Sequence, residues 1–281
     1  MTLIEAYTEA CGFLSGHGIQ SAALDAGLLV AKAAGVSRYH IYTHPEEEMD
    51  APALERLRMD IRRRAAGLPI AYLTGIREFM SLEFRVNESV LIPRPETEIL
   101  VETMLSELGR GALVVDVGTG SGCVAVSLAV LRPDVRVLAV DISEPALKTA
   151  EENVVLHGVS ERVAVLLSDL LSGVSYDEGF DAVAANLPYI PTGEMERLPA
   201  GVQYEPALAL DGGPDGLSLI RRLLPQAYRC LKPGGRVYLE VGASQAESVI
   251  LLAGEMGFTE PRSIMDLQGI ERVVCCRKTL R

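Results

Sequence analysis

The amino-acid sequence predicts an α/β fold in which a mostly parallel β-sheet is covered by helices on both faces, preceded by a small helical domain with a β-hairpin. Two observations lead to this fold class. From about residue 93 onward, short apolar runs alternate with helical segments, a pattern typical of parallel sheets. Before that point, apolar residues recur mainly at helical spacing. The 281 residues are therefore expected to form two domains, 1–92 and 93–281.

The first domain is expected to contain three helices and a hairpin. Apolar residues that recur on one helix face predict the helices, at 3–14, 20–34 and 51–66. Pro45 and Pro52 mark the break before the third helix and its start. The later stretch "REFMSLEFRVN" predicts two short strands with a turn near Ser81. Residues 87–95 then predict a connector into the second domain.

The second domain is expected to alternate strands with helices. Apolar runs predict strands at 112–118, 135–141, 162–169, 180–189, 234–242 and 271–278. Helical spacing predicts helices at 96–109, 122–131, 144–158, 216–231 and 245–257. Pro225 is expected to interrupt the fourth of these helices. A final hairpin would explain why the last strand follows so soon after "TEPRSIMD".

Composition excludes several classes of protein. The net charge is −12, with −9 on residues 93–281 and −3 on residues 1–92, so neither domain has the basic excess expected of a nucleic-acid binder. Five cysteines without a C-x-x-C pair suggest neither a zinc ribbon nor a disulfide framework, and the four histidines have no metal-like spacing. No apolar stretch is long enough to span a bilayer, and the N-terminus lacks the layout of a signal peptide. We therefore expect a cytoplasmic protein with no bound metal and no membrane contact.

A glycine-rich loop, "DVGTGSG", follows the first predicted strand of the second domain. Its residues Gly118, Thr119, Gly120, Ser121 and Gly122 would lie at the carboxyl edge of the sheet, where α/β proteins bind their ligands. A plain glycine turn is the alternative reading of such a loop taken alone.

Acidic residues at the ends of the next two strands favour a cofactor site. Asp141 ends the second strand, where an acid can accept hydrogen bonds from ribose hydroxyls. Asp169 ends the third strand and, taken alone, could simply cap a turn. Because parallel strands share their carboxyl edge, we expect both acids and the glycine loop to lie close together.

This combination resembles class I S-adenosylmethionine-dependent methyltransferases, which have a seven-stranded, Rossmann-like domain. By that resemblance, the loop from Gly118 to Gly122 would line the methionine and ribose of S-adenosylmethionine. Asp141 would hold the ribose hydroxyls, and the Asp169-Leu170 turn would border the adenine.

The fourth strand ends in "NLPY", Asn186 to Tyr189, which resembles the (N/D/S)-P-P-(Y/F) motif of methyltransferases that modify planar amino or amide nitrogens. Asn186 offers a side-chain carbonyl as an acceptor for the N–H of the substrate. The carbonyl of Leu187 is a second acceptor, held extended by Pro188, and Tyr189 can stack on the flat substrate group. A strand-terminating turn with a core tyrosine is the alternative. Leu187 replaces the first proline of the family pattern, in a form that adenine dimethylases of ribosomal RNA also show.

The first hundred residues separate these two kinds of methyltransferase. The segment "PIAYLTGIREFMSLEFRVNESVLIPRPETE" resembles the HemK/PrmC family, whose members methylate glutamine in class 1 peptide-chain release factors. The resemblance continues through "YEP" at 204–206 to the C-terminus. It implies that the connector closes over the methionine end of the cofactor, with Arg94 and Glu98 near it.

The resemblance therefore implies an enzyme that methylates N5 of the glutamine in the Gly-Gly-Gln motif of release factors, with S-adenosylmethionine as donor. The helical domain would recognise the rest of this protein partner, and we expect a monomer without stably bound nucleic acid. Two alternatives stay open. One is an adenine-N6 methyltransferase acting on nucleic acid, and the other is a cofactor-binding adaptor in which Leu187 disables catalysis.

Overall fold

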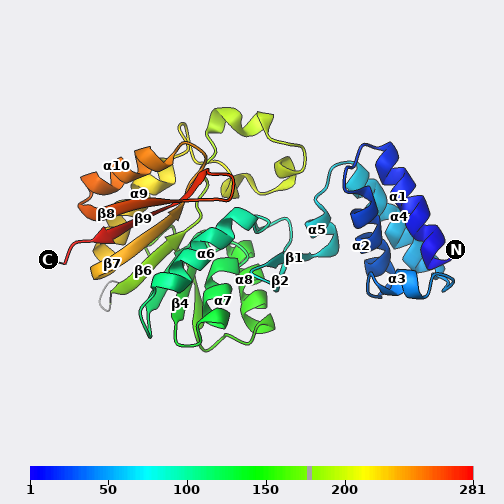
Figure 1. Ribbon diagram of the computed structural model, residues 1–281, viewed down its shortest axis with the longest axis horizontal. Coiled ribbons are helices and arrows are strands. Elements are labelled where there is room, and N and C mark those ends of the chain that lie inside the picture. The colour runs from blue at the N-terminus through cyan, green and yellow to red at the C-terminus, as the bar shows by residue number, and fades with distance from the viewer. Residues whose placement is uncertain (176–178, 281) are drawn as a thin grey trace. The chain divides into compact units, whose positions relative to one another are not determined.

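The computed structural model describes residues 1–175 and 179–280 (Figure 1). The chain forms two compact units. The first comprises Met1–Ile76 together with Pro199–Tyr204, and the second comprises Arg77–Leu198 together with Glu205–Arg281.

The first unit is a helical domain. Its helices are α1 (Leu3–Gly16), α2 (Ala22–Ala34), α3 (His40–Thr43), α4 (Ala51–Ala65) and α5 (Ile70–Thr74). The three helices predicted from periodicity are confirmed as α1, α2 and α4, whereas α3 and α5 are too short to give a periodic signal. Thr2 and Glu5 form a capping box at the start of α1, and Asp50 accepts a hydrogen bond from the backbone of Ala53 at the start of α4.

A segment distant in sequence completes this first unit. Residues 199–204 include the short 3₁₀ helix η2 (Val202–Tyr204). The Tyr204 hydroxyl donates to the carbonyl oxygen of Ala66 at 3.0 Å. The ring of Tyr204 also lies close to Gly67, where an added Cβ would stand 3.4 Å from Cε2. The unit is therefore not a simple N-terminal stretch of chain.

The predicted hairpin consists of β1 (Ile76–Phe79) and β2 (Leu82–Arg85), which pair in a two-stranded sheet. Met80 and Ser81 form the turn, both with positive φ. Phe79 and Phe84 are fully buried in the core of the second unit. Residues 77–92, expected from the sequence to belong to the N-terminal domain, belong to the second unit, because these two aromatic side chains are buried there.

The second unit contains a seven-stranded sheet in the order β5-β4-β3-β6-β7-β9-β8. The strands are β3 (Leu113–Val117), β4 (Arg136–Asp141), β5 (Val163–Leu167), β6 (Phe180–Ala185), β7 (Leu231–Glu240), β8 (Phe258–Met265) and β9 (Glu271–Lys278). The first five run parallel, and β9 pairs antiparallel with both β7 and β8. The predicted α/β fold, with its final hairpin, is confirmed.

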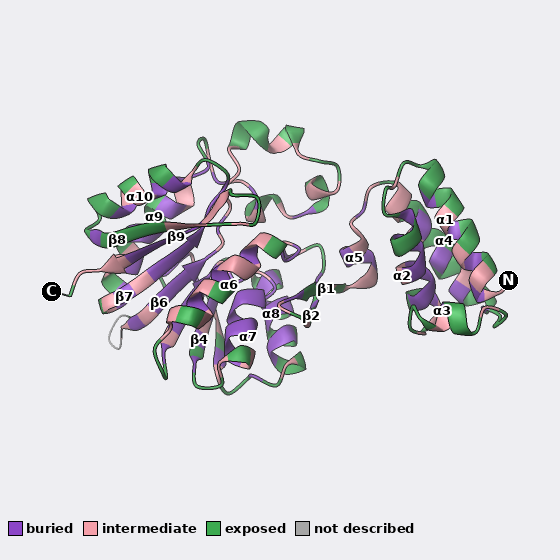
Figure 2. Ribbon diagram, in the orientation of Figure 1, coloured by how far each residue is buried: buried purple, intermediate pink, exposed green. Residues whose placement is uncertain are grey.

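Helices cover both faces of this sheet. They are α6 (Pro95–Glu107), α7 (Cys123–Leu131), α8 (Glu144–Leu156), α9 (Ser218–Cys230) and α10 (Ala246–Glu255). Neighbouring strand residues point to opposite faces, so Val114 joins a core with α6 and α7 while Val115 joins a core with α9 and α10. The central strands β3, β4 and β6 are accordingly largely apolar and buried (Figure 2), whereas the edge strand β8 is mostly exposed.

Two smaller features complete the second unit. The expected interruption of a helix at Pro225 was wrong: α9 continues through this proline, because losing one N–H bond is outweighed by the burial of Leu223, Leu224 and Ala227. The 3₁₀ helices η1 (Thr192–Arg197) and η3 (Ala207–Ala209) lie between β6 and α9. Within the described ranges, every helix is too short or too polar to cross a membrane.

Candidate active site

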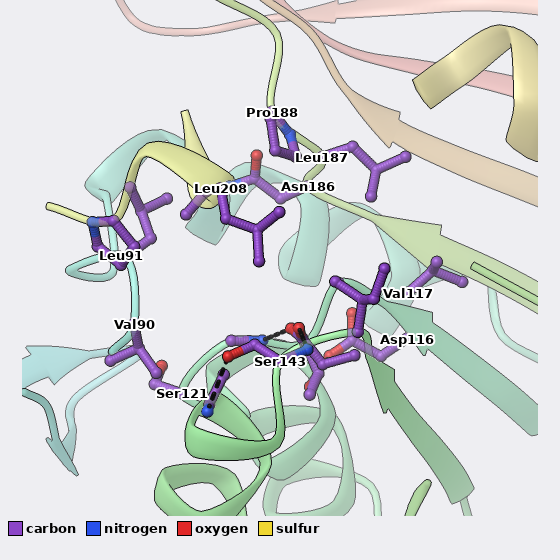
Figure 3. A pocket seen from close by; sticks show the side chains of 18 of the residues that line it. Val90, Leu91, Asp116, Val117, Ser121, Ser143, Asn186, Leu187, Pro188 and Leu208 are labelled. Carbon is purple, nitrogen blue, oxygen red and sulfur yellow. Dashed lines mark hydrogen bonds between the residues drawn. The ribbon is translucent and has the colours of Figure 1, made fainter. Parts of the chain in front are cut away.

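A cavity of about 240 Å³ opens at the carboxyl edge of the sheet. The strand order reverses between β3 and β6, and the loops that follow these two strands face each other there. In Figure 3, Asn186, Leu187 and Pro188 lie across the hollow from Ser121 and Ser143, with Leu208 between them. The predicted motifs after β3 and β6 therefore share one cavity.

The glycine loop joins β3 to α7. Gly118 has φ of +72°, and a Cβ there would stand 3.0 Å from Cδ2 of Leu187. Gly118 is therefore required both by its backbone conformation and by the close approach of the opposite wall. The residues from Gly118 to Ser121 line the cavity, whereas Gly122, although described, is not among its lining residues.

Asp116 holds the glycine loop through hydrogen bonds. Its buried carboxylate accepts hydrogen bonds from the Thr119 hydroxyl at 2.6 Å and from the backbone N–H of Ala125 at 3.2 Å. Burial raises the pKa of Asp116 to about 6, and the nearby charge of Asp141 acts in the same direction, while the two hydrogen bonds oppose the rise. Asp116 thus ties the loop to the first turn of α7.

Asp141 ends β4 and lines the same cavity. Its carboxylate accepts from the backbone N–H of Gly120 and from that of Ser143, both at 2.9 Å. Burial raises the pKa of Asp141, and these backbone hydrogen bonds oppose the rise. Asp141, the residue predicted to bind the ribose, therefore also holds the glycine loop in place.

Asp169 and Leu170 lie in the loop after β5 and line the cavity. Asp169 forms an ion pair with Arg222 at 2.6 Å, and Arg222 itself lines the cavity. Leu170 has a positive φ of 52°, which is uncommon for a branched residue. Arg222 could not be identified from the sequence, because it lies 53 positions away from Asp169 in the chain.

Asn186 follows the last residue of β6. Its side-chain nitrogen Nδ2 donates to the Thr97 hydroxyl at 3.0 Å. Leu187, which is buried, places its side chain against Gly118, and its neighbour Pro188 lines the cavity. The backbone carbonyl of Tyr189 accepts from the Gln245 side chain at 2.9 Å.

Tyr189 itself is half-buried and is not among the described residues that line the cavity. Burial raises the pKa of Tyr189 to about 12, so the phenol stays neutral at physiological pH.

The connector forms one wall of the cavity through Ser89, Val90, Leu91 and Pro93. Val90 and Leu91 are labelled in Figure 3. Glu205 anchors it, because this buried carboxylate accepts from the backbone N–H of Ile92 at 3.0 Å and pairs with Arg94. These contacts give a structural role to Glu205, the middle residue of the "YEP" motif. Its position in the chain alone does not reveal them.

Two predicted connector residues differ in position. Arg94 lines the cavity, whereas Glu98 is not among the described lining residues. Instead, Glu98 accepts from the backbone N–H of Met80 at 2.7 Å and so holds the turn of the hairpin. Among residues 1–175 and 179–280, no three His, Cys, Asp or Glu side chains are grouped so that they could hold a metal ion.

Comparisons with known proteins agree with this architecture. Residues 5–75 match the PrmC N-terminal domain, and residues 95–198 match the methyltransferase small domain. The release factor glutamine methyltransferase of Moorella thermoacetica is 44% identical, with 97% of each chain aligned. That of Caulobacter vibrioides is 39% identical, over 98% of this chain and 96% of the relative.

Solved structures share the fold at low identity. A methyltransferase from Pyrococcus furiosus superposes with a TM-score of 0.54 at 18% identity, over 79% of this chain and 98% of that one. A 16S rRNA N2 G1207 methyltransferase from T. thermophilus, solved with AdoMet and guanosine, superposes with a TM-score of 0.55 at 19% identity. That match covers 72% of this chain and 49% of the other.

The sheet order, the glycine loop and the acids after the next two strands define a class I methyltransferase. The full-length identity then makes the family specific: the chain belongs to the release factor glutamine methyltransferase family.

Proposed function

We propose that this protein transfers a methyl group from S-adenosylmethionine to N5 of the glutamine in the Gly-Gly-Gln motif of class 1 peptide-chain release factors. The observation that carries the substrate class is identity along both units with release factor glutamine methyltransferases. The active-site motif alone does not distinguish an amide from an adenine amino group, because both are planar nitrogens.

The cavity fits the donor chemically. S-adenosylmethionine combines a positively charged sulfonium with ribose hydroxyls and a flat adenine base that has apolar faces and a polar edge. Asp116 and Asp141 give the cavity wall a negative character that suits a cation, and Asp141 is a ready acceptor for the hydroxyls. Val90 and Leu208 supply apolar surface for the base. The glycine loop permits close approach of backbone to ligand.

When bound, S-adenosylmethionine supplies an electrophilic methyl group. The amide nitrogen of glutamine is a poor nucleophile, because its lone pair is delocalised into the carbonyl. We assign the catalytic roles to the motif after β6. Asn186 Oδ1 and the Leu187 carbonyl accept the two N–H bonds of the amide, which positions the nitrogen and favours a more pyramidal geometry. Pro188 holds that carbonyl extended, and Tyr189 packs beside the flat amide.

We further propose a role for the first unit in binding the partner, and a cytoplasmic location. The first unit binds the release factor outside its Gly-Gly-Gln loop, and the enzyme acts as a monomer in the cytoplasm. Two features support a protein rather than a nucleic-acid substrate. One is the match of residues 5–75 to the PrmC N-terminal domain, and the other is a net charge of −12.

A competition assay tests this function. Purified release factor and ribosomal RNA are offered together with labelled S-adenosylmethionine, and the products are analysed by mass spectrometry. We expect a single methyl group on the Gly-Gly-Gln glutamine and little label in RNA. A release factor whose glutamine is replaced by alanine is the control. Labelled RNA adenine beside unlabelled release factor would instead establish the adenine-N6 activity.

A further inference from the structure

Arg94 and Arg222 are the two cationic side chains among the described residues that line the cavity. Arg222 forms an ion pair with Asp169 in the loop after β5. Arg94 immediately precedes α6, and its backbone carbonyl accepts from the N–H of Thr97 at 3.1 Å. The Thr97 hydroxyl in turn accepts from Asn186 at 3.0 Å. Arg94 is therefore the cation at the end of the cavity where the motif after β6 lies.

Glu205 holds both the backbone and a side chain of the connector. Its own side chain is 1% exposed. Oε2 accepts from the backbone N–H of Ile92 at 3.0 Å, and Oε1 accepts from Nη2 of Arg94 in an ion pair. A carboxylate offers two acceptor oxygens, whereas a glutamine side chain offers one oxygen and one NH₂ group. Glutamic acid at this position can therefore serve both donors at once, and glutamine would present N–H groups to one of them.

The guanidinium of Arg94 keeps hydrogen-bonding capacity beyond this ion pair. It has five N–H donors in a planar fork. Within the described part of the chain, Glu205 is the acceptor for this side chain, which is 31% exposed. An unpaired guanidinium would repel the sulfonium of S-adenosylmethionine, and the charge of Glu205 offsets that repulsion. The remaining N–H groups suit an anionic group of the donor, because planar forks match carboxylates.

We propose that Arg94 binds the α-carboxylate on the methionine arm of S-adenosylmethionine, and that Glu205 is the positioning residue that orients the Arg94 guanidinium for this contact. The methyl group must face Asn186 for transfer. The methionine arm leaves the same sulfonium, so its carboxylate belongs at the end of the cavity where Arg94 lies. Glu205 is not among the described lining residues, and it acts through Arg94. The proposal rests on the donor of the function proposed above, but not on the identity of the acceptor.

Calorimetry of the full chain with two ligands tests the carboxylate contact. The probes are S-adenosylmethionine and its decarboxylated form, which keeps the sulfonium, ribose and adenine. Arg94→Met removes the guanidinium, so we expect affinity for S-adenosylmethionine to fall by ~10- to 100-fold, the scale of hydrogen bonds between charged groups. Affinity for the decarboxylated form should not fall. Arg110→Met is the matched control, because Arg110 is exposed and is not among the described lining residues. It should bind both ligands as wild type does.

Glu205→Gln tests the positioning role. The glutamine carbonyl can still accept from the N–H of Ile92, but its NH₂ group then faces Arg94, so the guanidinium is released while the connector backbone stays anchored. We expect affinity for S-adenosylmethionine to fall by ~3- to 30-fold and affinity for the decarboxylated form to be unchanged. In the Arg94→Met background, Glu205→Gln should cause no further loss, because the group through which Glu205 acts is absent.

A purely structural role for Glu205 would give different results. Its replacement would then weaken the binding of both ligands equally, and the loss would persist in the Arg94→Met background. Either result would overturn the proposal. Wild-type protein that binds the two ligands with equal affinity would overturn it as well.

An NMR measurement on wild-type protein does not depend on the folding of a Glu205 variant. The guanidinium ¹⁵N signals of Arg94 are assigned by their absence from Arg94→Met. The Nη signals should be resolved in the free protein, because pairing with Glu205 restricts rotation of the guanidinium, and they should shift more with S-adenosylmethionine than with its decarboxylated form. A single averaged Nη signal, or equal shifts with both ligands, would refute the proposal. Selective binding of S-adenosylmethionine by a protein that leaves release factor unlabelled would contradict the proposed function alone.

Discussion

At the scale of single residues, the groups proposed to be catalytic are concentrated where β6 ends. Asn186, Leu187 and Pro188 line the cavity, and Leu187 also packs on Gly118 of the opposite loop. The side chain of Leu187 therefore stabilises the cavity wall, while its backbone carbonyl is the group proposed to contact the substrate. The first proline of the family motif could supply the carbonyl but not this leucine contact.

Replacing Asn186 by alanine should abolish most turnover and leave donor binding largely intact. An orienting hydrogen bond lost at the transition state typically costs ~3–4 kcal/mol, or about a 10²- to 10³-fold loss in kcat. Steady-state kinetics and calorimetry of the same preparation measure the two effects. Wild-type turnover in this variant would contradict the role of Asn186.

Leu187→Pro should retain turnover but lose stability. The carbonyl of residue 187 remains next to Pro188, whereas the buried contact with Gly118 is lost. Removal of a buried aliphatic side chain of this size typically costs ~2–4 kcal/mol, so thermal melting should show a lower Tm. Leu187→Ala is the control, since it loses the same contact without restricting the backbone. A folded Leu187→Pro enzyme that binds donor but does not turn over would show that leucine serves another need.

At the scale of elements, hydrogen bonds connect the ends of the strands with the neighbouring loop and helices. Asp141, at the end of β4, accepts from Gly120 in the loop after β3, and Asp116, in β3, accepts from Ala125 in α7. Asn153 of α8 is fully buried and donates to the carbonyl of Ser121 at 2.8 Å. The glycine loop is thus held by side chains from three elements, in a backbone conformation with positive φ that glycine permits.

Asp141→Ala should weaken donor binding by roughly 1.5–3 kcal/mol, the scale of a hydrogen bond to a charged group. The loss combines the missing contact to the ribose with a looser Gly120. Asp141→Asn keeps one carbonyl acceptor and should fall between wild type and alanine. Calorimetric titration with S-adenosylmethionine measures all three proteins, and unchanged affinity in the alanine variant would refute the assignment.

At the scale of the whole molecule, the division into units determines where the chain can be cut. Residues 77–79 end β1, and Phe79 is buried in the second unit. A truncation that removes residues 1–80 would therefore damage the catalytic core. The appropriate cut lies before Arg77, at the boundary between the two units.

Deletion of residues 1–76 should weaken methylation of intact release factor far more than methylation of a short Gly-Gly-Gln peptide. The first unit would be needed to bind the rest of the partner, whereas the peptide reaches only the cavity. Circular dichroism and donor binding establish that the truncated protein is folded. Equal losses for the two substrates would show that the first unit does not recognise the release factor.

The pH dependence of stability reports on the buried Glu240. Its folded pKa of about 7 lies above the usual value, so folding favours the protonated form. The contribution of Glu240 to the free energy of unfolding is therefore fully present below the pKa of this residue in the unfolded chain. It is lost as the pH rises through about 7. Glu240→Gln should therefore raise Tm by ~3 °C at pH 8 and leave it nearly unchanged at pH 4. Glu255→Gln, at an exposed position, is the control. A Tm gain that is equal at both pH values would contradict this account.

The sequence by itself determined the order of strands and helices, the glycine loop, both strand-end acids and the motif from Asn186 to Tyr189. These follow from local pattern, because periodicity reports burial and the carboxyl ends of parallel strands must meet at one edge. The partners that hold these groups were decided by tertiary packing. Thr97 lies 89 positions from Asn186, and Glu205 lies 111 positions from Arg94. Contacts over such separations depend on how α6, β7 and the loop before α9 pack together, and no spacing rule along the chain encodes that arrangement.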